Sequence, residues 1–138
     1  MYQRACEAVR SWRHYPTSWV RRFPDQVPLR AGETVVVCAR AWGLWATVAC
    51  RIVYVIETED GSREFGFAYG TLADHIAQGE ERFLVQWDAD GRVWYEVLAF
   101  SRPRPLWARC GLPVIRRVQK KFASQSLLAM KSAVSRDE

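Results

Sequence analysis

Two Asp-Gly dipeptides constrain the fold of this chain more than any other feature of the sequence. Asp60-Gly61 and Asp90-Gly91 each separate two runs that are rich in β-branched and aromatic residues. Asp-Gly is typical of tight hairpin turns, because glycine adopts the positive φ angles that these turns require. Each dipeptide therefore predicts two neighbouring antiparallel strands.

Five runs in the middle of the sequence predict the strands of an antiparallel meander. In the second run, side-chain alternation places Arg51 on the opposite face from Cys50 and Ile52. In the third run, Phe65, Phe67 and Tyr69 share one face, so only small residues remain for the other. The expected strands cover residues 34–42, 44–57, 64–71, 81–87 and 93–101.

Helical patterns flank the meander on both sides. Apolar residues recur at helical spacing over residues 2–13, and an apolar stripe from Val114 to Met130 predicts a long C-terminal helix. A curved sheet that grips this helix is the simplest way to bury both apolar faces. The prediction is a single α+β domain over residues 1–138, with a helix and Pro-rich connection (1–30), a meander (34–101) and a C-terminal helix (106–133).

Composition excludes several classes of protein. The four cysteines form no Cys-x-x-Cys pair and there are only two histidines, so no zinc site can be assembled and we expect neither a metal nor another cofactor. Free thiols, no membrane-length apolar run and no signal-peptide core favour a cytoplasmic protein. The net charge of +5 gives no strong nucleic-acid signal.

Tryptophan is the unusual component of the composition. Seven tryptophans occur in 138 residues, and each brings a large apolar area together with one hydrogen-bond donor that needs a partner. This composition suits a walled cavity, an interface, or a core built from large side chains.

Three stretches resemble a known protein family. They are FGFAYGTLADHIAQGEERF at 65–83, WYEVLAFSRP at 94–103 and RRVQKKF at 116–122. Through them the chain is similar, from about Tyr2 to Ala133, to the bacterial and plant family called domain of unknown function 1990. The resemblance implies a helix-grip fold, like that of the START and birch-pollen-allergen superfamily, in which an apolar cavity lies between a curved sheet and the C-terminal helix. Such a domain opens with a strand, and this chain starts at its first helix. We therefore expect the first strand of the fold to be missing and one sheet edge to be unpaired.

One candidate site lies around the connection between the third and fourth strands. It contains Tyr69, His75, Glu80 and Glu81. A histidine beside a carboxylate is suited to general-base chemistry, and a tyrosine hydroxyl can orient a carbonyl group. The structural alternative is that His75 bonds its own turn while Glu80 and Glu81 are solvated.

A second candidate site lies on the fifth strand. By alternation Glu96 shares a face with Trp94, Leu98 and Phe100, which we expect to point toward the helix. A carboxylate on such a face is either paired with a cation or has a raised pKa. Arg51 is the expected partner; an ion pair with a purely structural role is the alternative.

Basic residues cluster after the last strand and along the C-terminal helix. They include Arg102, Arg104, Arg116, Lys120 and Lys121. Such a face is suited to an anionic membrane surface, although a solvated helix face explains it equally well.

Three functions remain open on this sequence. The first is a binding module that holds an apolar or amphipathic small molecule between sheet and helix. The second is a cyclase-like or hydrolase-like enzyme that uses His75 with Glu80 or Glu81. The third is an interaction protein that pairs with a partner chain, or with a second copy as a homo-oligomer, through its open edge and tryptophan-rich surface. The predicted ligand-binding residues are Arg51, Tyr69, His75, Glu81, Trp94, Glu96 and Phe100.

Overall fold

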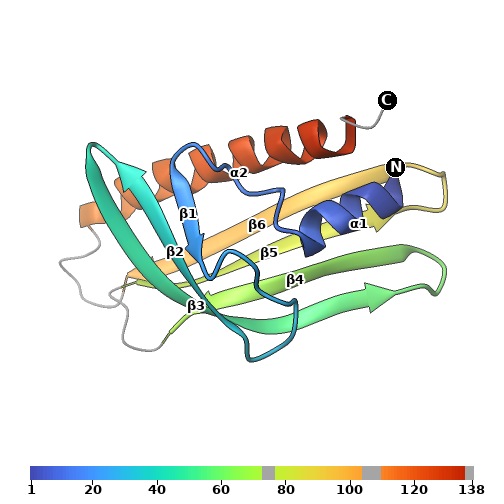
Figure 1. Cartoon of the computed structure of the whole chain (residues 1–138), viewed down its shortest axis with the longest axis horizontal. Helices are drawn as coiled ribbons and strands as arrows, with labels where there is room; N and C mark the ends of the chain where they lie inside the picture. Colours follow the sequence, from blue (N-terminus) through green and yellow to red (C-terminus); the bar gives the residue numbers. More distant parts are fainter. Residues whose placement is uncertain (73–76, 104–109, 136–138) are drawn as a thin grey trace.

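A computed structural model describes residues 1–72, 77–103 and 110–135 of the chain (Figure 1). It contains a twisted antiparallel sheet and two helices, which confirms the α+β class. In chain order the elements are α1 (Tyr2–Arg10), β1 (Val20–Phe23), β2 (Thr34–Ala41), β3 (Leu44–Thr58), β4 (Arg63–Thr71), β5 (Ala77–Trp87), β6 (Val93–Pro103) and α2 (Leu112–Ser135).

The sheet has six strands in sequential order, from β1 to β6, and each pairs antiparallel with the next. The five predicted strands are present as β2 to β6, and the sequence reading missed β1. Val20 pairs with Ala39 and Phe23 with Val36, so β1 lies along the free edge of β2. Prolines flank this segment in sequence and hide its strand character, because a short edge strand is defined mainly by the strand that it pairs with.

Both Asp-Gly dipeptides form the predicted hairpins. Gly61 and Gly91 adopt φ angles of 79° and 80°, in the left-handed region that favours glycine. Gly61 lies between β3 and β4, and Gly91 lies between β5 and β6. The meander predicted from these turns is therefore confirmed.

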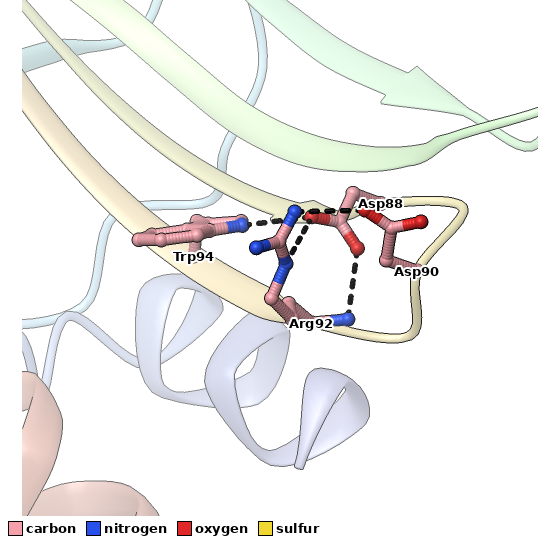
Figure 2. Close-up of polar contacts among 4 residues, drawn as sticks. All are labelled: Asp88, Asp90, Arg92 and Trp94. Atoms are coloured by element: carbon pink, nitrogen blue, oxygen red, sulfur yellow. Dashed lines mark hydrogen bonds and ion pairs between the residues drawn. The ribbon is translucent and has the colours of Figure 1, made fainter.

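Polar contacts stabilise the β5–β6 hairpin (Figure 2). The Asp88 carboxylate accepts hydrogen bonds from the Arg92 backbone N–H at 2.8 Å and from the Trp94 indole at 3.0 Å. The Arg92 guanidinium bridges Asp88 and Asp90 at 3.1 and 2.8 Å. The hydrogen bond from Trp94 and the contacts with Arg92 lower the pKa of Asp88. These contacts hold Trp94 at the tip of the sheet.

A β-bulge changes the alternation within β3. The register shifts between Ile52 and Tyr54, so Ile52 is 1% exposed whereas Tyr54 is 37% exposed. Before the bulge the predicted faces are correct, because Cys50 and Ile52 are buried and Arg51 is exposed. After it the faces exchange, since a bulge inserts one extra residue into the strand, and Val55 packs against the core instead of Tyr54.

The absence of a side chain at Gly66 has a local cause. A Cβ atom there would lie 2.1 Å from the carbonyl oxygen of Phe83 in β5. Only glycine fits this close approach of two backbones. Glycine at this position of β4 is therefore required by the neighbouring strand.

Both helices pack on one face of the sheet and contact each other (Figure 1). Helix α1 ends at Arg10, earlier than the predicted Arg13, and Trp12 follows it with a φ of 58°. The buried stripe of α2 is Phe122, Ser126, Met130 and Ala133. Within this stripe Ser126 is buried, whereas the apolar Leu127 beside it is 46% exposed. The predicted start of this helix, residues 106–109, lies outside the described residues.

Aromatic rings fill the interior under α1. The His14 ring lies 4.7 Å from the Phe83 ring, and the Trp12 ring lies 4.9 Å from the Phe67 ring, between centroids. Trp12, His14, Phe67 and Phe83 are each no more than 1% exposed. Within the described ranges, no helix combines the length and the hydropathy needed to cross a membrane.

Candidate functional site

A cavity of about 600 Å³ opens between the sheet and the N-terminal half of α2. It lies at the end of the sheet that carries the β2–β3 hairpin, away from α1. Small side chains from three strands form part of its wall, and α2 contributes branched aliphatic residues opposite them. The small residues are Ala39, Ala41, Ala46 and Ala99; those of α2 are Val114, Ile115 and Val118.

Aromatic side chains complete the walls and the rim of the cavity. Trp19 and Phe122 are largely buried, whereas Trp42 and Trp45 are 71% and 50% exposed beside the β2–β3 turn. The Trp19 indole donates a hydrogen bond of 2.5 Å to the side-chain oxygen of Gln125 on α2. This bond ties the segment before β1 to the helix that covers the cavity.

The polar centre of the cavity is a chain of three hydroxyl and carboxyl groups. Tyr69 on β4 and Glu81 on β5 are directly paired across the two strands, and both line the cavity. The Tyr69 hydroxyl donates a hydrogen bond of 2.5 Å to Oε2 of Glu81. Tyr15, which is 2% exposed, lies behind Tyr69 with its hydroxyl 2.6 Å away. The Tyr69 hydroxyl donates its one proton to Glu81, so in the bond between the two tyrosines Tyr15 is the donor and Tyr69 the acceptor.

Burial shifts the pKa values of these groups in the direction that disfavours charge. It raises the pKa of Glu81 to about 7, although the hydrogen bond from Tyr69 acts in the opposite direction. Burial and the nearby Glu81 charge raise the pKa of Tyr69 and of Tyr15 well above the usual value for tyrosine. The Cys50 thiol, also in the cavity wall, has its pKa raised to about 12 by the same two causes.

An arginine lies at the far end of this chain of groups. The Arg22 guanidinium on β1 is 5.5 Å from the Tyr15 ring centroid and 5.4 Å from that of Trp12. It also donates a hydrogen bond of 3.0 Å to the Asp25 carbonyl. Burial lowers the pKa of Arg22, while the nearby Tyr15 raises it. The cation is therefore separated from Glu81 by two tyrosines.

Three of the predicted site residues line the cavity. They are Tyr69, Glu81 and Phe100. Glu80, named in the alternative catalytic reading, lines it as well but alternates with Glu81 along β5. His75 lies outside the described residues.

The expectation that Trp94 and Glu96 face the helix is wrong. Trp94 and Leu98 are 54% and 51% exposed, so this face of β6 is the outer face of the sheet. Phe100 alternates with them and is 53% exposed, but near the end of β6 it also borders the cavity. Alternation correctly grouped these residues, but it does not tell which of two faces is buried. The inward face of β6 carries the half-buried Val93, Tyr95 and Val97.

The expected pairing of Glu96 with Arg51 is also wrong. Glu96 accepts a hydrogen bond of 2.5 Å from Arg82 on β5, and Arg51 is exposed on β3. Both partners of the Arg82–Glu96 pair are partly exposed, at 32% and 48% of their side-chain areas. Such pairs contribute at most about 1 kcal/mol. Glu96 is thus a surface ion-pair residue.

The outer face and the edge of β6 keep the interaction prediction open. Within the described part of the chain, β6 pairs only with β5, and Val53, Trp94 and Leu98 are exposed on the outer face. Pairing with a partner chain or a second copy stays a prediction. The expected anionic membrane surface at the exposed Arg116, Arg117 and Lys120 is likewise a prediction.

The sequence reading missed Tyr15, Trp19 and Cys50 as parts of the site. Tyr15 directly precedes Pro16, and Trp19 lies between Pro16 and Pro24, where neither helical nor strand periodicity gives a signal. Cys50 was placed correctly on the face of Ile52, but its position in the cavity depends on which elements pack above it. The high tryptophan content was the one local signal, since Trp19, Trp42 and Trp45 all line the cavity.

Comparisons with known proteins agree with the sequence resemblance. The family model described as domain of unknown function DUF1990 matches residues 1–129. A UPF0548 protein of Dictyostelium discoideum is 38% identical over 99% of this chain and 68% of its own length. A UPF0548 protein of Arabidopsis thaliana is 33% identical over 91% of this chain and 62% of its own length. The chain thus spans roughly two thirds of these relatives.

A solved structure shares the fold. The crystal structure of hypothetical protein jhp0584 from Helicobacter pylori superposes with a TM-score of 0.60 over 94% of this chain and 78% of that protein. Sequence identity is only 12%. The likeness therefore concerns the arrangement of sheet and helix.

Proposed function

Since the chain belongs to the DUF1990 family, we propose that its function resides in the cavity described above, as a binding module for an apolar or amphipathic small molecule. The observation that carries this proposal is a cavity of about 600 Å³ with mainly apolar walls and one buried carboxyl–phenol pair. Small-molecule sites commonly enclose roughly 300–1,000 Å³ and combine apolar walls with a few polar groups.

The contrast with the rest of the interior supports a binding role. Protein interiors are close-packed, and a void forfeits the dispersion contacts of every side chain around it. The region under α1 follows this rule with closely spaced rings. A cavity beside such a well-packed region is best explained by a ligand that completes the packing.

The rim of the cavity offers an entry. Trp42 and Leu44 flank the β2–β3 turn with 71% and 75% of their surfaces exposed. Large apolar side chains beside a cavity mouth attract an apolar molecule from water. A ligand would therefore enter past this turn and slide beneath α2.

Acid–base catalysis is a second candidate, favoured by the pKa of Glu81. A carboxyl group with a pKa near 7 can both accept and return a proton at neutral pH. Tyr69, hydrogen-bonded to Glu81, would position a reacting carbonyl or hydroxyl group. In this reading Glu81, rather than Glu80, is the base, because Glu81 forms the bond with Tyr69.

The binding proposal is tested by filling the cavity. The neutral, lipophilic dye N-phenyl-1-naphthylamine is titrated into the protein, and we expect a saturable rise in its fluorescence with one molecule bound per chain. Val118→Trp places a large side chain in the cavity wall and should abolish this signal. Val53→Trp makes the same change on the outer face, where Val53 is 53% exposed, and should leave the signal unchanged.

The same two variants also define the result that would contradict the binding proposal. Equal dye binding by Val118→Trp and Val53→Trp would place the dye elsewhere and contradict the proposal. Native mass spectrometry of the purified chain adds an independent measurement, since a retained ligand appears as a discrete mass increment. That increment should be absent from Val118→Trp.

A further inference from the structure

Resting on the proposed binding function, we propose that the ligand is a lipophilic cation: an ammonium group on an apolar body, with the ammonium seated against Glu81. The apolar body would occupy the space beneath α2, and the charged head would reach the wall formed by β4 and β5. Three independent features of the cavity lead to this class of ligand.

The first feature is the charge of the cavity. Among the described residues that line it, two are acidic, Glu80 and Glu81, and none is Lys, Arg or His. The whole chain, by contrast, has a net charge of +5. An acidic cavity in a basic protein is complementary to a cation, and it disfavours an anionic ligand such as a fatty acid.

The second feature is the direction of the hydrogen bonds. The Tyr69 proton goes to Glu81, and the Tyr15 proton goes to Tyr69. The Trp19 indole N–H likewise already donates a hydrogen bond, to the side-chain oxygen of Gln125. No described residue donates to the second Glu81 oxygen, Oε1, so this oxygen is a free acceptor at the polar centre of the cavity. A ligand that matches it must donate a hydrogen bond or carry positive charge.

The third feature is the aromatic wall. Tyr69, Trp19, Trp45 and Phe122 line the same cavity as Glu81. Aromatic faces attract ammonium groups through the ring quadrupole, and cages of this kind recognise quaternary ammonium ligands. Two of the tryptophans already contact cations on this protein, since Lys121 lies 4.5 Å from the Trp19 ring centroid and Arg21 lies 5.4 Å from that of Trp45. Both cations are exposed and do not line the cavity.

The surroundings of Glu81 predict how binding depends on pH. The titratable groups near it are Tyr69 on β4, Tyr15 after α1, Cys50 on β3 and Tyr95 on β6, all with raised pKa values. The residues of α2 that line the cavity are uncharged. The tyrosines and Cys50 stay neutral through pH 8. Glu80 also lines the cavity, but its side chain alternates with that of Glu81 along β5, so Glu81 is the titrating group beside the proposed ammonium position. A cation binds its ionised form, and affinity should rise with pH until Glu81 is fully ionised.

The test compares three probes of equal chain length by isothermal titration calorimetry at pH 8. They are decyltrimethylammonium, decanol and decanoate. We expect the ammonium probe to bind about 10-fold tighter than decanol, and decanoate to bind more weakly than decanol. The quaternary ammonium has no titratable proton, so its affinity reports on the protein alone. In the wild type it should fall about 5-fold between pH 8 and pH 6, because protonated Glu81 leaves the affinity at the decanol level.

Matched variants assign the effect to one carboxylate. Glu81→Gln should reduce binding of decyltrimethylammonium to the level of decanol and remove its pH dependence, while decanol binding stays unchanged and reports an intact cavity. Glu59→Gln removes an exposed carboxylate just after β3 that does not line the cavity, and it should leave both affinities within about 2-fold of the wild type.

The outcomes separate this inference from the proposed function. If decanol binds as tightly as the ammonium probe, or if Glu81→Gln leaves ammonium binding unchanged, the cationic class is wrong while the binding function stands. If none of the three probes binds, and the neutral dye also fails, the binding function itself is wrong.

Discussion

The two ends of the same sheet are built from side chains of different sizes, and this difference separates structure from function. Under α1 the inner face carries the large rings of Phe67 and Phe83, which meet Trp12, His14 and Tyr15. Under the start of α2 the inner face carries mainly alanine and valine, and the cavity opens there. The packed end supplies stability, and the hollow end supplies a site. Tyr15 and Tyr69 connect the two, since Tyr15 belongs to the packed end and Tyr69 lines the cavity.

The largest effect is expected from truncating the same residue type at each end. Phe83→Ala removes a ring that is 0% exposed and should lower the free energy of unfolding by about 3–5 kcal/mol. Phe100→Ala, at the cavity and 53% exposed, should lower it by less than about 1 kcal/mol. Urea denaturation measures both values. Equal losses would show that the two ends do not differ in packing.

A second effect distinguishes the packed end by its response to acid. His14 is fully buried with Nε2 lacking a partner, and burial lowers its pKa from 6.5 to about 3. Below pH 6.5 His14 is protonated in the unfolded chain but stays neutral in the folded protein. The free energy of unfolding therefore falls as the pH decreases toward 3. The loss at pH 5 should be about 2 kcal/mol. His14→Leu should flatten this part of the pH profile in urea denaturation, and an unchanged slope would contradict the assignment.

The hollow end should respond to pH in the opposite direction. Because the folded-state pKa of Glu81 is raised from 4.5 to about 7, its ionised form destabilises the fold above pH 4.5, and fully so above pH 7. Glu81→Gln should therefore stabilise the protein at pH 8 by about 1–2 kcal/mol, a value discounted for the partial exposure of Glu81. At pH 4 the variant should match the wild type, because Glu81 is then protonated in both states. Destabilisation at pH 8 would indicate that the Tyr69 hydrogen bond outweighs the cost of burial.

The last comparison shortens one valine to alanine at each end of the sheet. Val85→Ala, at a residue of β5 that is 0% exposed, should lower the free energy of unfolding by about 2 kcal/mol. Val118→Ala, at the half-buried cavity wall on α2, should lower it by less than about 1 kcal/mol, since its side chain already borders empty space. Thermal unfolding resolves the two. A larger loss at Val118 would mean that α2 depends on this contact for docking.

Much of the candidate site was accessible from the sequence, but its assembly was not. The sequence predicts Tyr69 and Glu81 as ligand-binding residues, because a tyrosine and a carboxylate lie close to the connection between the third and fourth strands. Their direct pairing across β4 and β5 depends on strand register, which the sequence between them does not fix. The cavity was predicted where large aromatics meet the helix, and it lies instead where small residues do. The Phe67 ring of β4 packs instead against Trp12, which follows α1.

The sequence by itself determined the features that depend on neighbouring residues. The Asp-Gly turns set the hairpins, alternation grouped the residues of each face, and helical spacing located α1 and α2. Tertiary structure alone decided which face of β6 is buried, why Ser126 rather than Leu127 points inward, and where the interior stays empty. The physical reason is the range of the interactions. Turn geometry and periodicity act within a few residues, whereas burial and close packing depend on side chains brought together from distant parts of the chain.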